Sequence, residues 1–147
     1  MNAEISELHP DDLGELLKLE RSSFSDPWTE YMFKDALESP FQTVYKLTED
    51  GNLVGYVCIH VFDADGEILS LAVSPEKRRL GYGGKLLGFA LGIMKNAGVA
   101  TVFLEVRKSN IPAASLYLAS GFSPVGVRKN YYRRPTEDAI VMRKDLN

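Results

Sequence analysis

The stretch "RRLGYGGKLLG", residues 78–88, sets two arginines and closely spaced glycines between an apolar run and a segment with helical periodicity. The run before it is "EILSLAV", residues 67–73, and the apolar residues after it are Leu86, Leu87, Ala90, Leu91 and Met94. Glycines at the start of a helix let backbone N–H groups approach an anion closely, and the helix dipole favours negative charge there. The loop therefore predicts a ligand that carries phosphate.

Two common phosphate-binding motifs do not fit these residues. A P-loop requires glycine five positions before Gly84 and Ser or Thr after Lys85, but Arg79 and Leu86 stand there. A dinucleotide fingerprint requires glycine three positions after Gly83, which is again Leu86. On the residues alone, an alternative stays open, in which the glycines only form a turn and the arginines are solvated.

The pattern on both sides of the loop predicts the fold class. Before it lie an edge strand, two helices that begin near Pro10 and Thr29, and a meander of three strands with turns at "TEDGN" (48–52) and "DADGE" (63–67). After it come a helix, an apolar strand, a further helix behind Asn110 and two last strands. The order βααβββαβαββ predicts one α/β domain over residues 1–147, with a mixed seven-stranded sheet and helices on both faces.

Composition excludes several classes of function. The formal net charge of −3 argues against a general nucleic-acid binder, so no direct nucleic-acid partner is expected. No run of eighteen apolar residues occurs and the N-terminus lacks a signal-peptide pattern, so we expect a cytoplasmic protein without a membrane partner. Cys58 is the only cysteine and His9 and His60 the only histidines, so no metal site is expected.

The loop resembles a known motif. Arg78-x-x-Gly81-x-Gly83, after a strand and at the start of a helix, is similar to the Q/R-x-x-G-x-G/A motif of the GNAT acetyltransferases, and the order of elements matches that fold. The blocks "LEVRKSN" (104–110), "ASLYLASGF" (114–122) and "RKNYYRRPTEDAIVM" (128–142) resemble those of RimI-type N-terminal acetyltransferases within that superfamily. The resemblance implies acetyl-CoA as the donor and a ribosomal protein's N-terminal alanine as the acceptor.

For the chemistry, the resemblance implies that Glu105 of "LEVR" acts as general base and that Tyr117, seven residues past Asn110, donates a proton to the leaving thiolate. From the residues alone, Glu105 could equally be a solvated strand residue, and Tyr117 a packed helix tyrosine. Cys58 has no histidine near it in any motif and is not expected to act as a nucleophile.

For the donor, the resemblance implies a cradle around the CoA pyrophosphate and a splayed strand end whose free N–H groups polarise the thioester carbonyl. Asn110 is expected both to cap its helix and to contact the CoA arm. The predicted acetyl-CoA-binding residues are Leu71, Ala72, Val73, Arg78, Arg79, Leu80, Gly81, Tyr82, Gly83, Gly84 and Asn110.

For the acceptor, the resemblance implies Pro27 and Trp28, between the first two helices, and Tyr131 and Tyr132, in the last hairpin. Trp28 could instead staple a helix to the core. Asp26 departs from the family pattern, which has an apolar residue before Pro-Trp, and this leaves strict preference for alanine open. The expected partner is a protein N-terminus, and the alternatives are a lysine or small-amine acetyltransferase and a CoA-binding or ribosome-associated module without catalysis.

Overall fold

The computed structural model describes residues 2–146 and has the predicted order of elements. The strands are β1 (Ala3–Glu7), β2 (Gln42–Glu49), β3 (Asn52–Phe62), β4 (Asp65–Val73), β5 (Thr101–Arg107), β6 (Ser123–Tyr132) and β7 (Glu137–Asp145). The α-helices are α1 (Leu13–Ser23), α2 (Glu30–Glu38), α3 (Tyr82–Asn96) and α4 (Ile111–Ala119), with short 3-10 turns η1 (Pro10–Asp12) and η2 (Pro75–Lys77). None of the described helices is long and apolar enough to cross a membrane.

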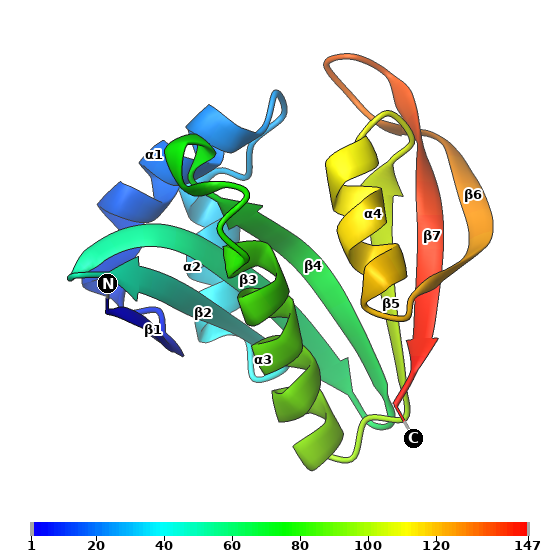
Figure 1. Ribbon diagram of the computed structural model, residues 1–147, viewed down its shortest axis with the longest axis horizontal. Helices are drawn as coiled ribbons and strands as arrows, with labels where there is room; N and C mark the ends of the chain where they lie inside the picture. The colour runs from blue at the N-terminus through cyan, green and yellow to red at the C-terminus, as the bar shows by residue number, and fades with distance from the viewer. Residues whose placement is uncertain (1, 147) are drawn as a thin grey trace.

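The seven strands form one sheet in the order β1-β2-β3-β4-β5-β7-β6, and its one parallel pair lies at the centre. β4 and β5 are paired from Asp65 opposite Thr101 to Ile68 opposite Leu104. Beyond these residues the two strands diverge, although β3 stays paired with β4 as far as Val73 (Figure 1). The sheet therefore opens into a wedge at the C-terminal ends of β4 and β5, where the resemblance implied a splay.

Helices cover both faces of the sheet, as the sequence predicts, and each face has its own core. On the α3 side the core includes Leu86, Leu87 and Met94, and on the α1 and α2 side it includes Leu16 and Phe33. β3 contributes to both cores because successive side chains point to opposite faces of a strand. Glu105 alternates with the buried residues of β5 that belong to the α3-side core, so it projects from the opposite face.

The two Asp-Gly pairs have different roles. Asp50 and Gly51 form the turn between β2 and β3 with φ values of 51° and 86°, as predicted for a tight hairpin. The prediction that Asp65 and Gly66 form the next hairpin turn is wrong, because the turn lies at Asp63 and Ala64 and Gly66 belongs to β4. A Cβ at Gly66 would lie 2.6 Å from the Met94 sulfur, so this glycine allows α3 to pack closely on β4.

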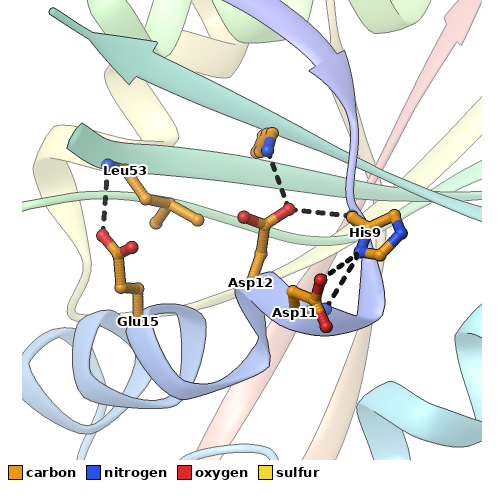
Figure 2. A network of polar contacts seen from close by, with 6 residues as sticks. His9, Asp11, Asp12, Glu15 and Leu53 are labelled. Atoms are coloured by element: carbon orange, nitrogen blue, oxygen red, sulfur yellow. Dashed lines mark hydrogen bonds and ion pairs between the residues drawn. The ribbon is translucent and has the colours of Figure 1, made fainter. Parts of the chain in front are cut away.

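Polar contacts fix the start of α1 to the sheet, and Figure 2 shows this network. The imidazole Nδ1 of His9 accepts a hydrogen bond from the backbone N–H of Asp11 at 3.1 Å. The backbone N–H of His9 donates to an Asp12 carboxylate oxygen at 2.8 Å. The Lys46 ammonium of β2 donates to the same Asp12 oxygen at 2.8 Å. The helix therefore starts at a fixed point against β2, and its last turn comes to lie near the open wedge of the sheet.

Candidate active site

Two cavities border the wedge between β4 and β5. The larger has a volume of about 640 Å³, and we call it the glycine-loop cavity because Gly81, Gly83 and Gly84 line it. The smaller has a volume of about 160 Å³, and we call it the Glu105 cavity after its strand carboxylate. Both cavities are lined by Tyr117, Leu71, Asn110, Phe24 and Ala113, so the two spaces meet along these residues.

Nearly all of the residues predicted to bind acetyl-CoA line the glycine-loop cavity. They are Leu71, Ala72, Val73, Arg78, Arg79, Gly81, Tyr82, Gly83, Gly84 and Asn110. Leu80 is the exception, since its side chain is 53% exposed and lines neither cavity. The end of β4 and the glycine loop, which lie close together in sequence, therefore form one side of the glycine-loop cavity.

The loop backbone requires glycine at its turn. Gly81 is the N-cap of α3 and has a φ of 82°, in the left-handed region of backbone conformation that residues other than glycine seldom adopt. A Cβ at Gly83 would lie 3.2 Å from a methyl carbon of Leu116, so α4 packs closely on this turn. The first N–H groups of α3 lack helical partners and lie beside the cavity, which suits an anion.

The basic residues of the loop are held by specific contacts. The Lys77 ammonium lies 2.7 Å from a Glu49 carboxylate oxygen, and the Tyr82 hydroxyl donates to the other oxygen. Arg78 donates from Nε to the Val73 carbonyl at 3.1 Å, which ties the loop to the end of β4. Glu49, which no sequence motif indicates, is 6% exposed at the end of β2 and contacts residues on both sides of the loop.

The Glu105 cavity contains most of the other predicted residues. Glu105 accepts an ion-pair contact from Arg128 Nε at 2.9 Å, and Trp28 and Tyr132 line the same space. Trp28 also packs on Phe33 with ring centroids 5.1 Å apart, so it both staples α2 and borders the cavity. Pro27 lies outside the lining residues.

The last hairpin brings two tyrosines close to Glu105. Burial, followed by the charges of Tyr131 and Glu105, raises the pKa of Tyr132, and Arg107 lies over its ring at 4.6 Å from the centroid. Tyr131 does not line the cavity, but its ring packs edge-on against that of Tyr132 with centroids 5.0 Å apart, and the guanidinium of Arg128, which pairs with Glu105, lies 5.9 Å from its centroid. Tyr132 therefore forms part of the cavity wall, and Tyr131 packs against Tyr132 outside that wall.

Tyr117 lies where the two cavities join. Its ring packs edge-on against Phe122 with centroids 6.0 Å apart, and burial raises the pKa of its hydroxyl to about 12. Asn110 begins the same helix by accepting a hydrogen bond from the Ala113 N–H at 3.2 Å, the predicted N-cap. A protonated phenol therefore stands at the junction on a capped helix.

Other chemistry has little support within residues 2–146. In that part of the chain no three His, Cys, Asp or Glu side chains gather where they could hold a metal ion. Cys58 is buried in the α1-side core, and burial followed by the charge of Glu20 raises the pKa of its thiol to about 12. At neutral pH this cysteine is a packed thiol and not a nucleophilic thiolate.

Comparison with known proteins gives a consistent result. The Acetyltransferase (GNAT) family matches residues 13–122. The [ribosomal protein bS18]-alanine N-acetyltransferase of Escherichia coli K12 is 34% identical over 94% of each chain, and a Bacillus subtilis protein provisionally given the same name is 36% identical over 99% of this chain and 97% of its own. A crystal structure of the E. coli enzyme superposes with a TM-score of 0.92 at 31% identity, covering 99% of this chain and 95% of the other. The chain therefore belongs to the GNAT family, and it is an acetyltransferase that uses acetyl-CoA.

Proposed function

We propose that this enzyme acetylates the N-terminal α-amine of a protein by direct transfer from acetyl-CoA in a ternary complex. The observation that carries the proposal is the junction of two differently charged cavities at Tyr117. The glycine-loop cavity is lined by Arg78 and Arg79, which suit the anionic CoA, and by Lys77, which is paired with Glu49. The Glu105 cavity is lined by three carboxylates, and the guanidinium of its one cationic residue, Arg107, donates to Glu137 and to two backbone carbonyls.

Charge favours a chain terminus as the acceptor. An α-ammonium has a pKa of about 7.7–8.0 and a lysine ammonium about 10.4, so a terminus gives up its proton far more readily near neutral pH. A carboxylate such as Glu105 can accept that proton through a bridging water. The carboxylates of the Glu105 cavity attract the acceptor as an ammonium, before it loses its proton.

The proposed step uses three parts of the site. Glu105 receives one proton of the ammonium and passes it to solvent, and the resulting amine attacks the thioester carbonyl. A C–N bond forms, the C–S bond breaks, and the second proton of the nitrogen leaves to water as the amide forms. Backbone N–H groups at the diverging end of β4, from Leu71 to Val73, stabilise charge on the carbonyl oxygen. Tyr117 gives its proton to the leaving sulfur and is reprotonated from solvent.

Relatives support a ribosomal acceptor. The enzymes that are 34% identical over nearly the whole chain are named for the alanine of ribosomal protein bS18. We propose that a small-subunit ribosomal protein with a small first residue is the acceptor here, and that the reaction takes place in the cytoplasm. Asp26 lines the Glu105 cavity, the acceptor cavity of this proposal, and its carboxylate adds to the attraction for an ammonium.

A panel of acceptors tests the proposal. Peptides with a free N-terminal alanine, the same peptides with a blocked terminus and one free lysine, and polyamines are incubated with acetyl-CoA and analysed by mass spectrometry. We expect acetyl groups on the free termini only, and the Glu105→Gln variant with the same peptides supplies the background. Modification of lysine or polyamine alone would refute the N-terminal proposal, and binding of CoA without any transfer would favour a non-catalytic role.

A further inference from the structure

Glu20 is a buried carboxylate in the acceptor cavity that neither the sequence motifs nor the proposed chemistry uses. It lies in the last turns of α1, is 1% exposed and lines the Glu105 cavity. The ion pairs found within residues 2–146 do not include it. A buried charge without a cation is costly, and burial raises the pKa of Glu20 although hydrogen bonds from Tyr56 and Trp28 oppose the rise.

Hydrogen bonds make Glu20 the centre of a brace across the cavity wall. One carboxylate oxygen accepts a hydrogen bond at 2.8 Å from the backbone N–H of Trp28, which lies in the loop between α1 and α2. The other accepts the Tyr56 hydroxyl at 2.5 Å, and that hydroxyl lies 2.6 Å from the Ser70 hydroxyl of β4. Because the phenol proton points to the carboxylate, Ser70 is the donor in the second contact.

The brace connects the two sides of the acceptor cavity. Trp28 borders the cavity from the α1–α2 loop, and Ser70 borders it from β4, immediately before Leu71, which lines both cavities. The distance between loop and strand therefore depends on Glu20. Its charge joins that of Asp26 in a cavity where Arg107 is paired with Glu137 and Glu105 is paired with Arg128.

We propose that Glu20 is a positioning residue for the acceptor: it holds the Trp28 loop against β4 and supplies buried negative charge that draws the acceptor ammonium into the cavity. This inference rests on the proposed N-terminal acetylation for the identity of the acceptor. It does not make Glu20 a proton-transfer group, since both oxygens already accept hydrogen bonds from the protein.

Steady-state kinetics with a matched set of variants tests the inference. Glu20→Gln removes the charge and keeps the size and one carbonyl oxygen, and Tyr56→Phe removes only the hydroxyl between Glu20 and Ser70. Glu15→Gln is the control, because Glu15 is exposed on the same helix and its contact with the Leu53 N–H is long, at 3.5 Å. KM for the peptide and KM for acetyl-CoA are measured separately, with the melting temperature of each variant.

A charge-assisted hydrogen bond has a free energy that corresponds to about tenfold or more in binding, so Glu20→Gln is expected to raise the peptide KM by about tenfold. Tyr56→Phe should raise it by about threefold, as for a neutral hydrogen bond. KM for acetyl-CoA should stay within about twofold in all variants, since the glycine-loop cavity is untouched. Equilibrium binding of the peptide gives the same comparison without turnover.

Two results would overturn the inference: an unchanged peptide KM in a folded Glu20→Gln protein, or an equal rise in both KM values together with a lower melting temperature, which would indicate a purely structural role. Failure of the proposed function looks different, because it is seen in the wild-type acceptor panel. If lysine or a polyamine is the true acceptor, the same comparison is made with that amine, and a selective rise in its KM still supports the role of Glu20.

Discussion

The glycine-loop cavity and the Glu105 cavity share a wall but are built in different ways. The first is formed largely by one stretch, from Leu71 to Gly84, and by the start of α4. The second collects residues from α1, the α1–α2 loop, β4, β5, α4 and β6, which are far apart in sequence. A site for a constant donor is thus local in the chain, whereas a site for a particular acceptor depends on the whole fold.

Charge separates the two cavities as well. Three basic residues and no acidic residue line the glycine-loop cavity within the described chain, whereas the Glu105 cavity has three carboxylates and one arginine. Opposite charges on the two sides of Tyr117 suit the anionic donor and the cationic acceptor of the proposed reaction. A substitution in one cavity should therefore leave the binding of the substrate proposed for the other cavity unchanged.

The largest expected effect is at the junction. Glu105→Gln and Tyr117→Phe should each lower kcat by about a hundredfold or more, as for the loss of a positioned acid or base, with KM for acetyl-CoA unchanged. The matched controls are Glu67→Gln on β4, whose carboxylate lies 3.7 Å from His60, and Tyr45→Phe, a buried tyrosine that lines neither cavity. Unchanged kcat in both catalytic variants would contradict the roles assigned here.

The pH dependence of kcat gives a second test of Tyr117. Burial raises the pKa of this hydroxyl to about 12, so the protonated form needed for an acid persists at neutral pH and is lost only as the pH rises through that value. The rate should therefore show no alkaline decline that depends on Tyr117 up to about pH 10. A decline near neutral pH that disappears in Tyr117→Phe would mean that the hydroxyl ionises far more readily than its burial implies.

On the donor side, the largest expected effect is at Gly81. Alanine at a φ of 82° costs about 1–2 kcal/mol, so Gly81→Ala should weaken acetyl-CoA binding by about tenfold and leave the peptide KM unchanged. Gly92→Ala is the control, because it lies in the middle of α3 with open space around a new Cβ and should stabilise the helix by about 0.5–1 kcal/mol. Calorimetric titration with acetyl-CoA measures both variants.

A smaller effect is expected at Glu49, which holds Lys77 and Tyr82 beside the glycine loop. Glu49→Gln keeps the side-chain size but removes the ion pair, so the loop loosens and KM for acetyl-CoA should rise by about threefold. Asp12→Asn is the matched control, since Asp12 pairs with Lys46 at 2.8 Å and lies outside both cavities. Equal shifts in the two variants would mean that only general stability had changed.

The difference between the cavities also explains what could be predicted from the sequence. Gly81, Gly83 and the arginines could be named from the sequence because the residues of the loop lie close together in the chain, and the structure places them around one cavity. The resemblance names Glu105 through its motif, and its position on the α1 side of the sheet follows from the alternation of side chains along β5.

Glu20 was missed because a glutamate near the end of a charged helix resembles a solvated residue, and its partner Tyr56 lies 36 positions away. A signal was nevertheless present, since Glu20 follows Leu16 and Leu17 at helical spacing and so falls on the apolar face of α1. Its burial depends on how α1 packs against β3, which no local pattern contains. The position of the turn at Asp63 and Ala64 was predicted wrongly for a similar reason. Gly66 is a glycine because α3 packs closely on it, and not because it forms the turn.

The smallest expected effect is at Leu80, the predicted acetyl-CoA-binding residue whose side chain lines neither cavity. If the loop binds the pyrophosphate through its backbone, Leu80→Ala keeps every N–H group, and KM for acetyl-CoA should change by less than about twofold. Leu116→Ala is the comparison, since Leu116 lines the glycine-loop cavity and packs near Gly83. A severalfold rise in Leu80→Ala would mean that the loop folds over its ligand and that the side chain, 53% exposed here, becomes part of the donor site.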